Sequence, residues 1–423
     1  MEFMTASQAS KLWHISQRRV QILCAEGRIP GVFKLGAAWA IPIDSLKPCD
    51  SRLKRTKRSN QRMKVIDLFC GCGGFSKGFE QAGFDICLGI DVWQDAIRTY
   101  KANFPNAETI VGDISNLTGN DLLSVAGMTA DEVDVIIGGP PCQGFSLSGK
   151  RLLDDPRNIL YKSFVRIVEN IKPKVFVMEN VPGLVRLFKG RVKEQVLEDF
   201  TNIGYKVEMR LLTASDFGVP QARKRVFFVG INKDKIKNVT YSFPTETHGE
   251  NKIPFVTCKD ALSDLDFIGD NRLLPDEAEY EFAAMSEYQK LMRKNSDKLW
   301  NHVTTIHTEK TRSIIAMVPD GGNYKDLPRE LWSTRKVNIA WTRMDSKKPC
   351  FTIDTGHNHH FHYRANRVPT VRESARIQSF PDDFRFIGIK TSQLKQVGNA
   401  VPPLLAQAVA ESIIVALGGE KDV

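Results

Sequence analysis

The chain has 423 residues, more than one typical domain contains and enough for two or three. Hydrophobic residues make up 42% and charged residues 26%, an ordinary balance for a globular protein that excludes the disordered, fibrous and membrane classes. Lys and Arg outnumber Asp and Glu by 59 to 49, and the resulting net charge of +10 is compatible with a polyanionic partner.

The cysteine spacing and the first residues indicate the cellular setting. The eight cysteines include no C-x-x-C pair, so neither a disulfide framework nor a zinc finger is predicted. The opening residues, MEFMTASQAS, lack the basic start and apolar stretch of a signal peptide. We therefore expect a reduced, cytoplasmic setting, with association to the nucleoid if the partner is DNA.

Residues 1–48 look like a separate small module. Helices are predicted over 5–12 and 16–23, and the apolar residues in 33–36 and 39–42 predict a small β-wing. The stretch resembles the excisionase-like winged helix-turn-helix modules, which bind DNA through the second helix. On that resemblance the side chains that read DNA are Gln17, Arg18, Arg19 and Gln21. A small helical domain that contacts another protein is the alternative.

Residues 49–62 form a basic linker. Seven Lys and Arg residues occur from Arg52 to Lys64, and no acidic residue interrupts them. Such a run can contact phosphates, with release of counterions, or can simply be a solvated connection.

From residue 63 onward, apolar runs alternate with helical patterns. This alternation predicts an α/β fold with a parallel, doubly wound sheet, in which ligands bind at the carboxyl ends of the strands. From 232 to 366 the alternation is lost, which predicts a smaller irregular domain, and 367–423 returns to the first domain, which begins with 63–231. Strands are predicted at 64–69, 86–90, 133–137 and 174–178, and helices at 76–81, 95–103, 160–170 and 401–417.

A glycine-rich turn follows the first predicted strand. The run from Asp67 to Phe75 reads DLFCGCGGF, and Asp91 follows at the end of the second strand, where an acidic group can hold ribose hydroxyls. A dinucleotide fingerprint would have a third glycine at the position of Ser76, so the pattern favours another adenosine-bearing cofactor over a nicotinamide one. A purely structural tight turn is the alternative.

Two reactive side chains follow the next two strands. Cys142 lies behind Pro140 and Pro141, just past the end of a buried strand, whereas most lone cysteines are inert core residues. Glu179 ends the next strand, and adjacent strands would bring it near Cys142. A carboxyl group in a covered pocket can hold a proton for a ring nitrogen, although a strand-end Glu in solvent is the alternative.

These runs, together with later ones in the same order, resemble the motifs of the DNA cytosine-5 methyltransferases. The resemblance covers roughly residues 63–415 and implies a Rossmann-like methyltransferase sheet with a target-recognition domain at 232–366. The matching runs are DLFCGCGG from Asp67, PPCQ from Pro140, ENV from Glu179, QARKR from Gln221, TVRESARIQSFP from Thr370 and QVGNAVP from Gln396.

The resemblance implies roles for the catalytic residues. Cys142, followed by Gln143, would add to carbon-6 of cytosine, and Glu179 would hydrogen-bond or protonate ring nitrogen 3. Arg225, with Arg223 in support, would hold the carbonyl oxygen of the base. Carbon-5 then becomes enamine-like and takes the methyl group. No residue is assigned as the base that removes the carbon-5 proton.

The cofactor implied is S-adenosyl-L-methionine. Phe69 would lie against the adenine, Asp91 would hold the ribose, and Asp113 would face the adenine amine. Many members of the family place an aromatic residue directly after the acidic one, whereas here Val92 follows and Trp93 comes one later. The remaining cofactor residues implied are Gly71, Gly73, Gly74, Val92, Ile114, Pro140 and Asn399, the last near the methionine end.

The partner implied is double-stranded DNA, from which the target base is flipped out. In the loop after the nucleophile, Ser148 would probe the vacated space, and Lys150 and Arg157 would contact phosphates. Loops around 321–322 and 352–355 are candidates for reading sequence. His357, His359, His360 and His362 could bind a metal, but no matching acidic or Cys ligands are evident, so a polar, DNA-facing loop without metal is expected.

Two other functions remain open at this point. One branch of the family methylates tRNA, and a DNA-binding regulator with a methylase-like body is also conceivable. The intact Cys142, Glu179 and Arg225 favour an active enzyme. By resemblance, the setting is a bacterial or phage restriction-modification system with a separate cognate endonuclease, and residues 1–48 could repress the enzyme's own promoter.

Overall fold

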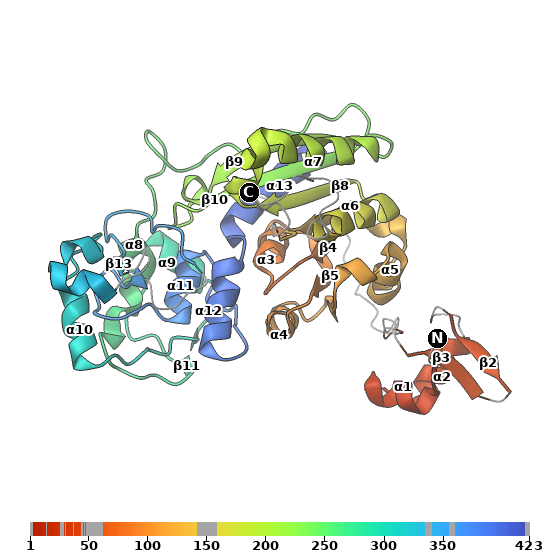
Figure 1. The fold of residues 1–423 in the computed structure, drawn as a ribbon, viewed down its shortest axis with the longest axis horizontal. Coiled ribbons are helices and arrows are strands. Elements are labelled where there is room, and N and C mark those ends of the chain that lie inside the picture. The colour runs from red at the N-terminus through yellow and green to blue at the C-terminus, as the bar shows by residue number, and fades with distance from the viewer. Residues whose placement is uncertain are drawn as a thin grey trace.

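The protein is described by a computed structural model, and Figure 1 shows its parts. We use the term sheet lobe for the described residues of 62–256 together with 403–418, and small lobe for those of 257–386. Helix α12 (Lys390–Asn399) lies between the two lobes (Figure 1). The residues described are 3–13, 15–25, 29, 31–36, 38–43, 45, 47, 62–141, 159–334, 341–354 and 360–418.

The sheet lobe contains a seven-stranded sheet with the order β6-β5-β4-β7-β8-β10-β9. Strands β6 to β8 of that order are mutually parallel, as predicted. The bounds are β4 (Lys64–Leu68), β5 (Asp85–Asp91), β6 (Glu108–Val111), β7 (Val135–Gly138), β8 (Val175–Asn180), β9 (Tyr205–Thr213) and β10 (Lys224–Asn232).

The four predicted strands are parallel, but the whole sheet is not, because one strand that was not predicted, β10, runs in the opposite direction. Strand β10 runs antiparallel to both β8 and β9. Residues 214–223 connect β9 to β10 through one short 3-10 turn, and this segment is too short for the crossover that a parallel pair needs. The sheet is therefore mixed at the edge that carries β9.

Helices cover both faces of the sheet, so the doubly wound arrangement is confirmed. Alternate strand residues enter opposite cores: Val65 and Val135 face one, and Ile66 and Ile136 face the other. Helices α3 (Gly74–Gln81), α4 (Gln94–Asn103) and α13 (Pro403–Ala416) supply the first core. Helices α5 (Gly119–Ala126), α6 (Ile159–Ile171) and α7 (Arg191–Asn202) supply the second.

The chain returns to the sheet lobe through α13. A Cβ at Gly78 would lie 2.4 Å from both the Ala406 Cβ and the Pro403 carbonyl oxygen, so α3 and α13 pack closely only because residue 78 is glycine. The stretch Lys390–Ala416 is long and apolar enough to cross a membrane by composition. It is, however, divided into α12 and α13 at Ala400–Pro402, and α13 packs into the core.

The small lobe is built from short helices, 3-10 turns and two-residue strands, and buried arginines hold it together. Arg367 forms two 2.7 Å hydrogen bonds with Glu373, and Arg376 binds both Asp264 and Asp382. The lobe's elements are α8 (Cys258–Leu262), α9 (Glu287–Arg293), α10 (Glu309–Ala316), α11 (Val371–Ile377), β11 (Glu277–Ala278), β12 (Leu299–Trp300), β13 (Thr342–Arg343) and β14 (His360–Phe361).

The N-terminal part has its own small core, in which Trp13, Val20 and Ile41 are buried. The two helices and the hairpin that the sequence predicts are present, and a further strand, β1, pairs with β3. Their bounds are β1 (Phe3–Met4), α1 (Ala6–Leu12), α2 (Gln17–Ala25), β2 (Phe33–Leu35) and β3 (Ala38–Pro42). The role of this part as a DNA-binding module stays a prediction.

Candidate active site

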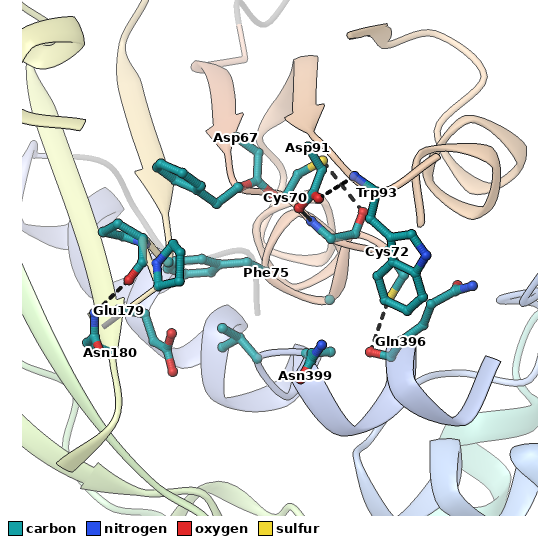
Figure 2. Close-up of a pocket in the computed structure, with 18 of the residues that line it drawn as sticks. Asp67, Cys70, Cys72, Phe75, Asp91, Trp93, Glu179, Asn180, Gln396 and Asn399 are labelled. Atoms are coloured by element: carbon teal, nitrogen blue, oxygen red, sulfur yellow. Dashed lines mark hydrogen bonds between the residues drawn. The ribbon is translucent and has the colours of Figure 1, made fainter. Parts of the chain in front are cut away.

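A cavity of about 830 Å³ opens at the carboxyl ends of four parallel strands. Strands β4, β5, β7 and β8 each deliver polar or glycine residues to it, which is where a sheet of this kind binds ligands. The C-terminal end of α12 forms a further wall. Figure 2 shows Asp91 and Trp93 toward one side of this cavity and Glu179 and Asn180 toward the other.

The glycine turn after β4 is bound to the end of β5. The Asp91 carboxylate accepts the Gly71 N–H at Oδ2 and the Trp93 N–H at Oδ1, both at 2.9 Å. Burial raises the pKa of Asp91, and these backbone hydrogen bonds oppose that rise. The carboxylate thus has a fixed direction at the edge of the cavity.

Most of the residues predicted to bind cofactor line this cavity. Val92 is exposed, and Trp93 is half-buried with the Lys395 ammonium 4.9 Å from its ring centroid. The predicted residues found in the lining are Phe69, Gly71, Gly74, Asp91, Val92, Asp113, Ile114, Pro140 and Asn399.

Gly73 has a different place from the one predicted. It is not among the lining residues, and it begins α3 with a φ of +100°. A Cβ there would lie 2.4 Å from the Phe104 ring. Glycine at this position therefore allows α3 to pack closely against Phe104, the residue directly after α4.

At the other end of the cavity, the buried Glu179 forms an ion pair with the half-buried Arg225. Arg225 Nε lies 2.8 Å from Glu179 Oε1. The two residues come close because β10 pairs with β8 from Val226 onward, with Val226 opposite Asn180. Burial raises the pKa of Glu179, and Arg225 and then Arg223 oppose that rise. A Cβ at Gly139 would lie 3.0 Å from Glu179 Oε2, so a larger residue in the loop after β7 would crowd the Glu179 carboxyl group.

Two further contacts fix the walls around this pair. Asn180 Nδ2 donates to the Pro140 carbonyl oxygen at 2.8 Å, which binds the proline loop to β8. Arg223 is buried and donates to the Gly398 carbonyl oxygen at 2.9 Å. Pro140 and Pro141 line the cavity directly before Cys142 in the chain.

Five predicted site residues lie outside the described residues: Cys142, Gln143, Ser148, Lys150 and Arg157.

Part of the predicted reading loop lines the cavity instead. Thr352, Ile353 and Asp354 are lining residues, while Thr355 lies outside the described part of the chain. The preceding Cys350 donates its N–H to the Pro220 carbonyl oxygen and accepts the Ala222 N–H, at 2.9 and 2.7 Å. A segment beyond the small lobe's β13 therefore forms one wall of the cavity.

The expectation of a DNA-facing histidine loop is wrong for the two histidines that the structure describes. His360 and His362 are buried, and burial lowers the pKa of His362 to about 3. Its Nδ1 accepts the Ala365 N–H at 2.9 Å, so the ring is neutral and structural. His357 and His359 lie outside the described residues, and within those that are described no group of three His, Cys, Asp or Glu residues could hold a metal ion.

Asp67 was not predicted as a site residue, yet it lines the cavity. Its side chain is 1% exposed, and its Oδ1 has no hydrogen-bond partner in the described protein. The Asp67–Asp91 end of the cavity is thus rich in acceptors, and it fits a ligand that carries donors and positive charge, as S-adenosylmethionine does.

Comparisons with known proteins agree with this geometry. The family described as C-5 cytosine-specific DNA methylase matches residues 63–415. The chain is 43% identical over 378 residues to Type II methyltransferase M.DdeI of Desulfomicrobium norvegicum, covering 83% of this chain and 88% of that one. It is 40% identical over 355 residues to Type II methyltransferase M1.HphI of Haemophilus parahaemolyticus, covering 83% and 87%.

Solved structures give the same fold. An E. coli prophage protein assigned as a DNA modification methyltransferase has a TM-score of 0.70 at 29% identity, covering 84% of this chain and 99% of that one. The S. pombe Dnmt2 methyltransferase has a TM-score of 0.51 at 16% identity over the same shares, a likeness of fold alone.

Proposed function

Because the chain belongs to the C-5 cytosine-specific DNA methylase family and is a DNA (cytosine-5-)-methyltransferase of the Type II restriction-modification type, we propose the following mechanism of methyl transfer for it. It transfers a methyl group from S-adenosylmethionine to carbon-5 of a cytosine that is flipped out of duplex DNA. The observation that carries this proposal is the ion pair between Glu179 and Arg225 in a cavity whose lining includes Pro141, the residue directly before Cys142.

The chemistry follows from the weak nucleophilicity of carbon-5. When the Cys142 thiolate bonds to carbon-6, ring electrons move toward nitrogen 3 and carbon-5 becomes enamine-like. Glu179 stabilises the electron density that develops on nitrogen 3, because its raised pKa favours a carboxyl group that can hold a proton for this nitrogen. Loss of the carbon-5 proton after methylation then allows Cys142 to leave and restores the ring.

Arg225 has two tasks in this scheme. Its Nε binds Glu179, and its planar fork of donors can reach a carbonyl oxygen at the same time. It therefore orients Glu179 and holds the base. The Arg223 guanidinium supports this end of the cavity, because it donates to the backbone carbonyl oxygens of Ile353 and Gly398.

S-Adenosylmethionine, when bound, supplies the electrophilic methyl group. We assign the ribose to Asp91, the adenine to Phe69 and Asp113, and the methionine end to Asn399. Val92 is exposed and small, so we assign the second face of the adenine to Trp93, whose ring lines the cavity beside Lys395.

We assign the contacts with DNA to segments of the chain around the cavity and to the N-terminal part. Ser148, Lys150 and Arg157 are proposed to follow the displaced base and the phosphates, and the small lobe to read the sequence. In the N-terminal part, Arg18 on α2 is exposed, and Arg19 lies beside it. We propose that this part is a winged helix-turn-helix that binds DNA and represses the enzyme's own promoter.

Two alternatives are weaker. The relatives reported above at 43% and 40% identity are both Type II methyltransferases, which favours DNA over tRNA as the substrate. A regulator with an inactive body would have no need of the Glu179–Arg225 pair inside a cavity.

Methyl transfer from labelled S-adenosylmethionine tests the function directly. We expect label on carbon-5 of cytosine in duplex DNA and a loss of at least about 10³-fold in Cys142→Ala, because the nucleophile is removed. Cys24→Ala, which removes a buried thiol from the N-terminal part, is the matched control and keeps full activity. Label on tRNA alone would replace the proposal by the RNA alternative, and label on neither would favour the regulator.

The role of Trp93 is tested by binding. Trp93→Ala is expected to weaken S-adenosylmethionine binding about fivefold to tenfold, because stacking contributes about 1 kcal/mol. Cofactor should quench tryptophan fluorescence in the wild type and in Trp39→Ala, and should not do so in Trp93→Ala. Equal affinity and equal quenching in all three proteins would show that Trp93 does not contact the adenine.

Repression is tested with a reporter under the enzyme's own promoter. Deleting residues 1–48, or changing Arg18 and Arg19 to Ala, should raise reporter output severalfold while methylation continues. Equal output with and without residues 1–48 would exclude autoregulation.

A further inference from the structure

Asp67 is a buried carboxyl group with one bound and one unsatisfied oxygen. Ser76 Oγ donates to Asp67 Oδ2 at 2.6 Å, and the Tyr100 hydroxyl lies 2.7 Å from the same Ser76 oxygen. Since the single Ser76 proton points to Asp67, Tyr100 donates to Ser76. Ser76, which stands where a dinucleotide fingerprint would have glycine, thus fixes the carboxyl group in place.

The other oxygen has no such support. Asp67 Oδ1 is buried without a hydrogen-bond partner in the described protein, although Asp67 lines the cavity. A buried carboxyl oxygen without a partner is costly whether or not it carries the proton, so its presence at a ligand site indicates that a ligand supplies the missing partner. Figure 2 shows Asp67 beside Asp91 at the same end of the cavity.

Among the described residues, the groups that act on Asp67 include no cation. The titratable groups that act on it or respond to it are Asp91, Cys70, Cys72 and Tyr100, from β5, the glycine turn and α4. The basic residues of the cavity lining, Arg223 and Arg225, adjoin Glu179 at the other end. Burial, with a smaller contribution from Asp91 and opposed by Ser76, raises the pKa of Asp67 to about 8.

We propose that Asp67 is a proton-linked counter-charge for the methyl donor: the cationic donor enters as Asp67 gives up its proton, and the resulting carboxylate balances the donor's positive charge. This inference rests on S-adenosylmethionine being the cofactor. The balance is simple, because one neutral carboxyl group and one cationic donor become a paired carboxylate and donor plus one released proton. After transfer the sulfur centre is neutral, so the counter-charge loses part of its partner and the proton returns as product leaves.

Calorimetry counts this proton. At pH 7, the heat of S-adenosylmethionine binding is measured in phosphate and in Tris, whose ionisation enthalpies differ. We expect about one proton to be released by the wild type and by the surface control Asp131→Asn, and close to none by Asp67→Asn. Proton counts that are equal in the wild type and Asp67→Asn would overturn the inference. Absence of any binding heat in a folded wild-type protein would instead overturn the cofactor assignment.

The pH dependence gives a second readout. Below a free-state pKa of about 8 the proton must leave before or during binding, so wild-type affinity should rise as pH increases from 6 toward 8, by at most about tenfold per pH unit. The donor's own ammonium titrates equally against every variant, so the difference from Asp67→Asn isolates this carboxyl group.

Ser76→Ala leaves the Asp67 carboxyl group in place, so it provides a test that remains available if Asp67→Asn does not fold. It removes the hydrogen bond that lowers the pKa of Asp67, so the midpoint of the affinity profile should move to higher pH. A midpoint that is unchanged in Ser76→Ala would contradict the role assigned to Asp67.

Discussion

The antiparallel pairing of β10 with β8 determines what the cavity can do. It places Phe227 opposite Glu179 and brings Arg225, two residues earlier, within 2.8 Å of the Glu179 carboxylate. An ion pair with a buried carboxylate contributes little net stability, because the desolvation of its charges offsets their attraction. Its presence at the end of a core strand is therefore better explained by function, and the raised pKa of Glu179 agrees with that reading.

The cavity also depends on both lobes. Residues 350–354 of the small lobe run beside Pro220–Arg223 of the sheet lobe. Cys350 shares backbone hydrogen bonds with Pro220 and Ala222, and the Ile353 N–H donates to the Gln221 side chain. On the opposite wall, Cys72 donates to the Gln396 carbonyl oxygen of α12 at 3.5 Å. If the small lobe reads the DNA sequence, as we propose, a movement of this lobe on DNA would reach the walls around Glu179 through these contacts.

Much of this was predictable because β-strands with apolar runs and glycine turns leave strong local patterns. The strand ends at Asp91 and Glu179 and the glycine at 71 were found in that way. The antiparallel turn of β9 and β10 was missed because strand direction depends on connection length and not on composition. Asp67 was missed because a single acidic residue within an apolar strand gives no local sign of its burial or of its bond to Ser76. The two described histidines were misread as exposed because their burial depends on contacts made only in the folded lobe, such as that of the His360 ring with Phe351 and that of the His362 ring with Tyr363.

The central claim is that Cys142 attacks carbon-6 of the flipped cytosine, and trapping that bond tests it most directly. In duplex DNA with fluorine in place of the carbon-5 hydrogen, the final proton loss cannot occur, so the adduct should accumulate. Proteolysis and mass spectrometry are then predicted to find the nucleotide on the peptide that contains Cys142, only when S-adenosylmethionine is present to complete the methylation. Methylation of ordinary DNA with no trapped adduct, or with the adduct on another residue, would contradict the account.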